Sequence, residues 1–267
     1  MSKYHDKKYL ALFNSTLGIE GKSVLEVGGS SSPELLYDYK PGKWTCVNLN
    51  RVAVDSFSEN TKKYRPAFTA KYLDINKYES TEEYDLIYSI DSFEHINGLE
   101  YGMRVMYEAL RPNGYLFTVF GPIWSCDVGH HLSLPAPEGN LYFENGVLEP
   151  WQHLSFSETS LFKYLVPRYS EQTAKRAIDF IYHSKDINRL FDHDYMEILT
   201  KSDFNPVLVL RKRKGKAPNI AGATNTREFL WILKKGRITI TEKISILLRF
   251  GFSYVWDIKY KLGRETI

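Results

Sequence analysis

Three side chains that could take part in acid–base or metal chemistry lie close together in the middle of the chain. Asp91, Glu94 and His95 follow an apolar run, and His153 lies further along. If the segment is helical, the i, i+3, i+4 spacing puts its three side chains on one helix face. Mixed carboxylate and imidazole ligands suit a divalent ion such as Mg²⁺, Mn²⁺ or Zn²⁺. His95 could instead be a general base without a metal, and Glu94 and His95 could simply cap a helix.

A second group of histidines lies in a stretch rich in proline and glycine. Residues 121–150 include the adjacent pair His130 and His131. Two neighbouring histidines in such a loop cannot both face one core, so we expect at least one to be exposed or to face a ligand. The alternative is a loop histidine bonded to a main-chain carbonyl. The candidate catalytic bases are therefore His95, His130, His131 and His153.

The most informative feature is a glycine turn preceded by a carboxylate. Val24–Val27 is a β-branched apolar run, Gly28 and Gly29 allow a ligand to approach the main chain, and a helix is predicted from Pro33, with Ser32 as its N-cap. Strand, glycine turn and helix form nucleotide sites in open α/β sheets. Glu26 would repel a pyrophosphate, and no complete Gly-x-Gly-x-x-Gly is present, so a nicotinamide site is disfavoured. The alternative is an ordinary tight turn.

The elements that must position these residues alternate along the chain. Apolar runs predict strands at 24–27, 44–50, 68–74, 84–90 and 115–120, and helices at 5–19, 33–39, 102–110 and 155–165, with a turn at 111–114. Less regular segments at 204–211 and 252–259 are expected to be strands. The alternation predicts an α/β fold with a doubly wound, mostly parallel sheet. The long loop between the fifth strand and the next helix, residues 121–155, is predicted to be a lid.

Bulk composition restricts the class of protein. The 267 residues are enough for one large domain, and the apolar (43%) and charged (25%) fractions are those of a soluble globular chain. Cys46 and Cys126 are the only cysteines, so neither a disulfide framework nor a cysteine metal site is expected. No signal peptide and no apolar run of bilayer length occurs. We therefore predict a cytoplasmic protein without a membrane span.

The net charge of +3 conceals an uneven distribution. Residues 206–267 carry 14 Lys and Arg against 4 Asp and Glu, and Arg211–Lys216 is the densest basic cluster. This cluster could be a solvated strand end. It could also be a positive rim for a phosphate-bearing acceptor, a nucleic acid or an anionic membrane surface.

Together these segments resemble class I S-adenosylmethionine-dependent methyltransferases over roughly residues 20–165. The resemblance rests, in order, on Val24–Gly28, Asp74–Ile75, Tyr84–Ile87, Asp91–Ile96 and Leu110–Tyr115. It implies a Rossmann-like methyltransferase fold in which residues 1–205 bind S-adenosylmethionine and the basic residues 206–267 complete the sheet and the acceptor site. It assigns cofactor contacts to Glu26, Gly28, Gly29, Asn48, Leu49, Asp74, Ile75 and Ser89.

Within that resemblance, Glu26 would orient the methionine end of the cofactor, Asn48 the ribose and Asp74 the adenine amino group. The chain departs from the family where Ser30 and Ser32 replace glycines and an amide at Asn48 replaces an acid. An amide bonds a ribose hydroxyl without charge assistance, so weaker cofactor binding is expected. The cluster of Asp91, Glu94 and His95 with a distant His153 is also similar to metal sites of ubiquinone-pathway and small-RNA methyltransferases.

The function expected from this resemblance is O-methylation of a small hydroxylated or phosphorylated acceptor, such as a sugar, a glycan precursor or a capsule or lipopolysaccharide unit. The Gly-Pro-x-Trp, Gly-His-His and Pro-Trp-x-His segments resemble surface-glycan methyltransferases. One alternative is an RNA 2′-O-methyltransferase, which the small net charge and the lack of an RNA-binding motif disfavour. Another is a catalytically inactive cofactor-binding module. The sequence does not predict the oligomeric state.

Overall fold

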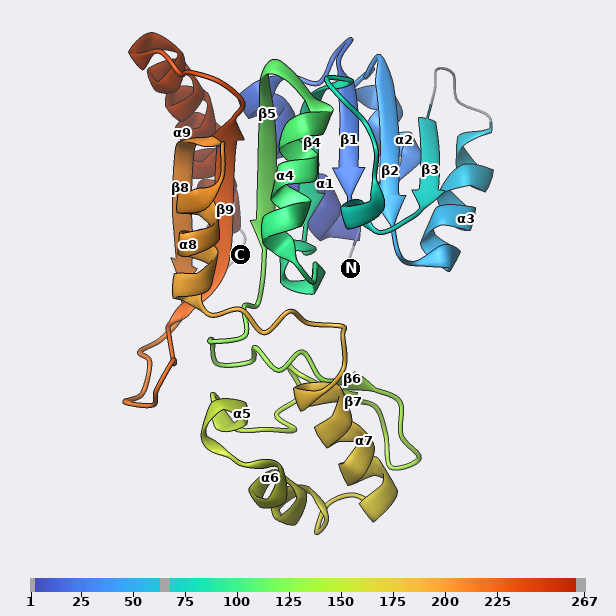
Figure 1. The fold of residues 1–267 in the computed structure, drawn as a ribbon, viewed down its shortest axis with the longest axis vertical. Coiled ribbons are helices and arrows are strands. Elements are labelled where there is room, and N and C mark those ends of the chain that lie inside the picture. The colour runs from blue at the N-terminus through green and yellow to red at the C-terminus, as the bar shows by residue number, and fades with distance from the viewer. Residues whose placement is uncertain (1–2, 63–67, 263–267) are drawn as a thin grey trace.

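The computed structural model describes residues 3–62 and 68–262, with residues 3–6 and 252–262 described by their backbone alone. Its centre is a seven-stranded sheet in the order β3-β2-β1-β4-β5-β9-β8 (Figure 1). Strands β1 to β5 are parallel, and β9 is antiparallel to both β5 and β8. The predicted doubly wound, mostly parallel sheet is confirmed. The strands are β1 (Ser23–Val27), β2 (Lys43–Asn48), β3 (Phe68–Tyr72), β4 (Tyr84–Ile90), β5 (Leu110–Phe120), β8 (Asn205–Arg213) and β9 (Thr226–Lys234).

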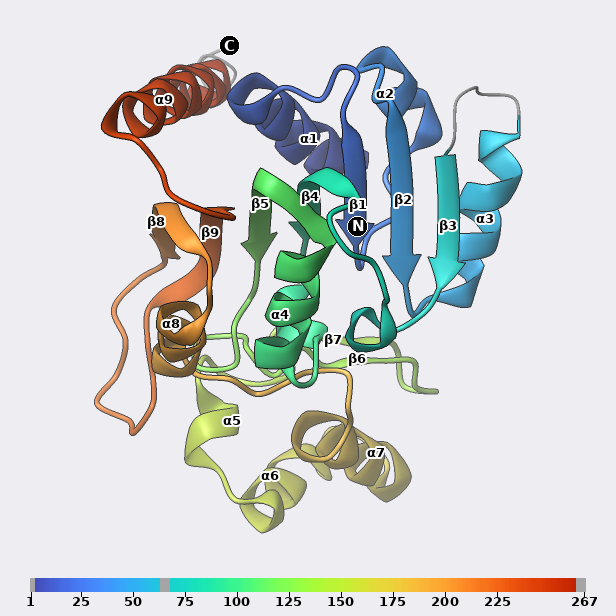
Figure 2. The same ribbon diagram turned by 45° about the horizontal axis from the view of Figure 1, so that its top comes forward.

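Helices cover both faces of this sheet (Figures 1 and 2). One face packs against α4 (Leu99–Ala109) and α8 (Asp192–Lys201). The other packs against α1 (Lys3–Leu17), α2 (Pro33–Asp38), α3 (Arg51–Thr61) and α9 (Ile240–Leu262). Short 3-10 turns, η1 (Ile75–Lys77) and η2 (Phe93–His95), follow β3 and β4.

The alternation of side chains along each strand separates the two cores. In β1, Leu25 packs in the core beneath α4, whereas Val24 packs in the core beneath α1. Successive residues of a strand point to opposite faces, so a continuous apolar run is what a sheet covered on both sides requires. Glu26 has the same parity as Val24, and its side chain therefore turns toward the α1 face.

An insert, residues 121–191, joins β5 to α8 and lies beyond the carboxyl ends of the parallel strands (Figure 1). It contains the hairpin β6 (Ser133–Leu134) and β7 (Leu141–Tyr142) and the helices α5 (Gln152–Ser155), α6 (Glu158–Leu165) and α7 (Glu171–Tyr182). Its apolar side chains, among them Leu132, Leu161 and Ile178, form a separate hydrophobic core. The predicted loop at 121–155 is thus the first half of a larger folded unit.

Two expectations about local structure are wrong. Residues 111–114 do not form a turn outside the sheet, because β5 begins at Leu110 and its register against β4 shifts between Tyr84 and Leu86. Residues 252–259 belong to α9, and β9 occupies the sheet position between β5 and β8. A helix that is apolar on more than one face can imitate the alternation of a strand over a short window. Among the described residues, no helix is long and apolar enough to cross a membrane.

Candidate active site

The turn after β1 is closed so tightly that only glycine fits. Gly28 has a φ of +79°, and a Cβ on it would lie 2.1 Å from Ser92 Oγ. A Cβ on Gly29 would lie 2.3 Å from Glu26 Oε1. The two glycines therefore hold the end of β1 against the segment that follows β4, with the main chain of the turn left uncovered by side chains.

The carboxylate of Glu26 is buried and fully engaged by neighbouring donors. It accepts hydrogen bonds from the Ser31 amide (2.9 Å) and hydroxyl (2.6 Å), from Trp44 Nε1 (2.7 Å) and from Cys46 Sγ (2.9 Å). Burial raises the pKa of Glu26, and these hydrogen bonds oppose the increase. The carboxylate thus faces the turn, as expected. Its hydrogen bonds go to Ser31, at the end of the turn, and to the neighbouring strand β2, so its role in this structure is to hold the turn in place.

A cavity of about 230 Å³ opens beside the turn. Asn48, at the end of β2, donates from Nδ2 to the carbonyls of Gly28 (2.8 Å) and Gly29 (3.1 Å). Leu49 and Val52, next in sequence to the lining residues Asn48 and Ala53, are 60% and 78% exposed. The cavity is lined by Glu26, Gly28, Gly29, Ser30, Ser31, Asn48, Asn50, Ala53, Tyr88 and Ile90.

Other predicted cofactor residues have mainly structural contacts. Asp74 follows β3 and accepts a hydrogen bond from the Asn76 amide (2.9 Å), and Ile75 is buried in the α4 core. The Ser89 hydroxyl donates to Val27 O (3.0 Å), so it joins β4 to β1 and does not line the cavity. Ser32 makes no capping hydrogen bond, because its hydroxyl donates to Glu34 instead (2.5 Å).

The segment after β4 is not the helix that the Asp91–Glu94–His95 spacing suggested. Asp91 has a φ of +48°, and a single 3-10 turn follows. Glu94 is buried, and its Oε1 accepts from the amide of Gly121, the first residue of the insert (3.1 Å). Burial, with a further contribution from the charge of Asp91, raises the pKa of Glu94 well above its usual range. His95 Nε2 lies 3.9 Å from Glu94 Oε1.

His95 meets His131 of the insert edge to face, with 5.2 Å between ring centroids. His95 Nδ1 bonds to Asp186 O, and His131 Nε2 bonds to Pro122 O. Because a carbonyl oxygen only accepts, these two nitrogens carry the hydrogens, and the basic nitrogens are His95 Nε2 and His131 Nδ1. Burial and the neighbouring His95 lower the pKa of His131 to about 3, so its ring is neutral near pH 7.

The other two predicted bases, His130 and His153, are in the interior of the insert. Their ring centroids are 5.4 Å apart. His130 Nδ1 accepts from the Leu132 amide (3.2 Å), and His153 Nε2 donates to Trp124 O (2.7 Å). Burial lowers the pKa of His130 to about 2 and that of His153 to about 4. Neither His130 nor His131 is exposed, and the two rings face different neighbours; that one of them faces a ligand stays a prediction.

The predicted metal ligands do not converge. Within residues 3–62 and 68–262, no group of three or more His, Cys, Asp and Glu side chains is placed to hold a metal ion. His153 packs against Trp124 inside the insert, and Asp91 is held away from a helical spacing by its left-handed backbone. The structure therefore gives no support to a site made of Asp91, Glu94, His95 and His153.

Sequence reasoning missed two contributions to this region. Ser92, which touches the glycine turn, lies within the Asp91–Ile96 motif but was given no role of its own. Tyr142 lies on the hairpin of the insert, and burial, Glu144 and Asp91 together raise its pKa, which places it within electrostatic range of Asp91. The adjacent Phe143 stacks on His131 with 5.5 Å between ring centroids. Only the folded insert brings these aromatic rings to the end of β4.

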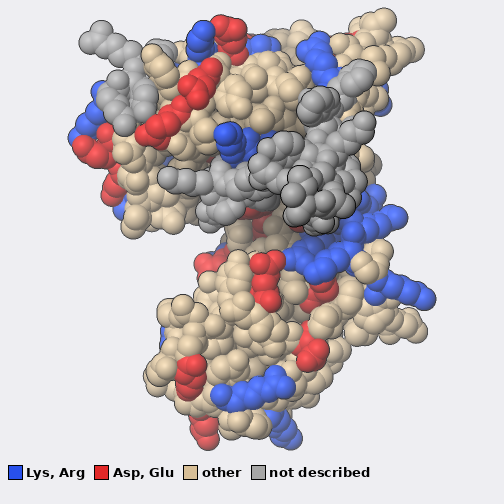
Figure 3. Space-filling view, turned by 180° about the vertical axis from the view of Figure 1, so that it is seen from behind, with Lys and Arg blue, Asp and Glu red and all other residues tan. Residues whose placement is uncertain are grey.

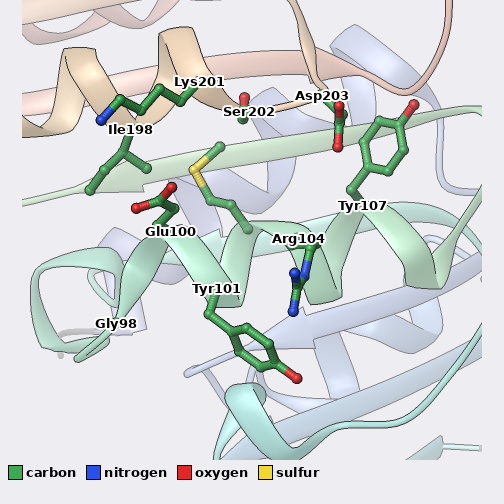
Figure 4. A pocket seen from close by; sticks show the side chains of 10 residues that line it. Gly98, Glu100, Tyr101, Arg104, Tyr107, Ile198, Lys201, Ser202 and Asp203 are labelled. Carbon is green, nitrogen blue, oxygen red and sulfur yellow. The ribbon is translucent and has the colours of Figure 1, made fainter.

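A further cavity, of about 400 Å³, lies between α4 and α8. Figure 4 shows Glu100 of α4 facing Ile198 and Lys201 of α8 across it. None of the predicted site residues lines this cavity. The chemistry-bearing side chains instead gather at the carboxyl edge of the sheet, where the glycine turn, the end of β4 and the insert meet.

Comparison with known proteins agrees with this arrangement. Residues 25–118 match the family profile described as a methyltransferase domain. A malonyl-[acyl-carrier protein] O-methyltransferase of Calditerrivibrio nitroreducens is 26% identical over 117 residues, which are 43% of this chain and 45% of that protein. The match thus spans less than half the length of this curated relative.

Solved structures share the fold at low sequence identity. A putative S-adenosylmethionine-dependent methyltransferase from Listeria monocytogenes is 14% identical, with a TM-score of 0.53 over 87% of this chain and 100% of its own. One from Mesorhizobium loti is 13% identical, with a TM-score of 0.56 and the same coverage. The chain therefore has the fold of these S-adenosylmethionine-dependent methyltransferases, and its residues 25–118 are similar to the methyltransferase-domain family.

Proposed function

We propose that this chain transfers a methyl group from S-adenosylmethionine to a hydroxyl oxygen of a small acceptor such as a sugar or a glycan precursor. The observation that carries the proposal is the meeting of His95 and His131 at the sheet edge that holds the glycine turn. The match of residues 25–118 to the methyltransferase-domain family supports the cofactor, and the curated relative described above is an O-methyltransferase by name.

The cavity beside the turn fits the cofactor. Its lining includes no Lys, Arg or His, so a sulfonium ion meets no like charge there. A Cβ at Gly28 or Gly29 would collide with Ser92 or Glu26, so the turn keeps its uncovered main chain, and the exposed Leu49 and Val52 offer apolar cover for the adenine. Asn48 and Asp74 would hold the ribose and the adenine. When bound, the cofactor supplies an activated methyl group.

An attacking hydroxyl must lose its proton, and the two imidazoles differ in their capacity to take it. Burial disfavours a protonated His131, so this ring is poorly suited to take the proton. The His95 side chain is 45% exposed, and its basic Nε2 can pass a proton to solvent. We therefore assign the proton acceptor to His95 and the orientation of that ring to His131.

The surroundings favour a hydroxylated acceptor. Tyr142 and Phe143 supply aromatic surface near Asp91, a combination suited to the apolar face and the hydroxyls of a sugar ring. The insert would act as a lid that excludes water, and residues 206–267 would complete the acceptor site from the β8–β9 side.

A phosphate on the acceptor is a further part of this proposal. Lys and Arg side chains gather where β8 and β9 extend toward the insert (Figure 3). Arg211, Lys212 and Lys214 pair with acidic neighbours, whereas Arg213 and Lys216 form no ion pair with any described residue. These two side chains would contact the anionic group.

Incubation of the purified chain with methyl-labelled cofactor tests the proposal. The acceptors offered are free sugars, nucleotide sugars and RNA. Label in a sugar-bearing acceptor is expected, with RNA unlabelled. Transfer to RNA that falls steeply with added salt would identify the alternative nucleic-acid enzyme. Cofactor binding without transfer to any acceptor would favour the inactive module.

A further inference from the structure

Large exposed aliphatic side chains are rare on the described surface, and they occur in two places. Leu49 and Val52 are next in sequence to residues that line the cavity beside the glycine turn. Ile240, Ile244 and Leu248 lie on α9 and are 79%, 51% and 56% exposed. Their spacing of four residues puts them on one side of the helix. A helix of a globular protein usually presents polar side chains to solvent on this side.

The opposite side of α9 is already occupied. Ile246 and Phe250 are buried in the core shared with α1. Ile240, Ile244 and Leu248 thus lie outside the hydrophobic cores of the described residues, and polar side chains in their place would leave these cores intact. Contiguous exposed apolar surface of this kind marks an interaction site.

Basic side chains flank the stripe. Arg237, Lys243 and Arg249 are all exposed. Glu242, the acid of the first turn, is engaged by Lys234, with 2.7 Å between Nζ and Oε2. The outer side of α9 thus combines aliphatic side chains with an excess of positive charge.

We propose that the outer face of α9, defined by Ile240, Ile244 and Leu248 with Lys243 and Arg249, binds the surface of an anionic phospholipid bilayer. A helix with an apolar stripe between basic residues lies in the plane of the interface, where it buries the stripe and pairs its charges with lipid headgroups. A second copy of the chain fits less well, because pairing two such faces brings like charges together.

The position of α9 is compatible with activity at the bilayer. Figures 1 and 2 place the start of α9 near one end of the sheet and the insert beyond the opposite, carboxyl edge. Contact through α9 leaves the glycine turn and His95 accessible to a dissolved acceptor.

Sedimentation of the full chain with lipid vesicles tests the proposal. Binding to phosphatidylcholine vesicles that contain phosphatidylglycerol is expected, with much weaker binding to phosphatidylcholine alone and a decrease as salt is added. The double variant Ile244→Ser/Leu248→Ser should bind at least about tenfold more weakly. Lys243→Glu should also weaken binding and reduce its salt dependence. Val52→Ser, which removes an exposed aliphatic side chain far from α9, should bind vesicles like the unmodified chain.

Two results would overturn the proposal. The first is that the unmodified chain binds neither kind of vesicle, binds both equally, or binds with an affinity that the α9 variants do not change. The other is a stable dimer in solution that Ile244→Ser/Leu248→Ser converts to a monomer without any vesicle binding, which would assign the face to self-association. Circular dichroism melts check that each variant is folded. We expect unchanged melts, because the replaced side chains lie outside the core.

Discussion

His95 and His131 lie edge to face, 5.2 Å between ring centroids, although one follows a central strand and the other belongs to the insert. Each ring is fixed by a main-chain carbonyl, Asp186 O for His95 and Pro122 O for His131. Pro122 lies near the start of the insert and Asp186 near its end, so each carbonyl belongs to one of the two chain segments that connect the insert to the sheet. The connections of the insert therefore set the orientation of the proposed base.

Replacement of the two histidines should separate turnover from cofactor binding. His95→Ala is expected to lower kcat by about 100-fold, the usual contribution of a general base. His131→Ala should lower it less, because His131 positions His95, and the double variant should resemble His95→Ala alone. Initial rates of methyl transfer and calorimetric titration with cofactor measure the two quantities. His193→Ala, at an exposed ring on α8, is the control.

Unchanged turnover in both single variants would remove the histidines from the mechanism. Strictly additive losses would show that the two rings act independently.

Glu26→Gln should reduce both stability and cofactor affinity. The carboxylate accepts hydrogen bonds from Ser31, Trp44 and Cys46. The side-chain NH₂ group of a glutamine would face some of these donors and could not accept from them. A buried donor left without a partner costs about 1–3 kcal/mol. Denaturant unfolding and calorimetric titration would measure the two losses. Full stability with intact cofactor binding would contradict the role of Glu26 in holding the turn.

Stability should fall as the solution is acidified below the ordinary pKa of histidine. Burial lowers the pKa values of His130, His131 and His153 to about 2, 3 and 4, from 6.5. The unfolded chain therefore binds protons that the folded chain excludes as the pH falls below about 6.5. Each histidine contributes up to about 1.4 kcal/mol of destabilisation per pH unit until its folded pKa is reached.

Thermal unfolding between about pH 8 and about pH 5 measures this dependence. His130→Gln should make the loss in acid shallower, whereas His193→Gln, at an exposed position, should leave it unchanged. A melting temperature that is constant over this range would show that the buried rings do not limit acid stability.

The sequence was informative where local patterns determine structure. The apolar run Val24–Val27, the paired glycines and the order of strand and helix predicted the central sheet and its glycine turn. By contrast, Asp91, Glu94 and His95 gave a helical spacing that the left-handed backbone of Asp91 removes. That conformation accompanies the close contact of Ser92 with Gly28, a long-range constraint that no local pattern reveals.

The insert shows the same limit. Its core joins Leu132, Leu161 and Ile178 across a long stretch of chain, so the burial of His130 and His153 depends on contacts between distant segments. Residues 252–259 were expected to be a strand because their apolar residues alternate over a short window, whereas their backbone belongs to the α9 helix.

The most direct test of the proposed function is calorimetric titration of the chain and of its Gly29→Ala variant with S-adenosylhomocysteine. A Cβ at residue 29 would lie 2.3 Å from Glu26 Oε1, so the turn must open to accept it. Gly251→Ala, where no described atom lies within 4 Å of the added carbon, is the matched control. We predict that S-adenosylhomocysteine binds the unmodified chain and Gly251→Ala saturably and one to one, and that it binds Gly29→Ala at least about tenfold more weakly. Absence of binding to the folded, unmodified chain, or equal affinity in all three proteins, would contradict it.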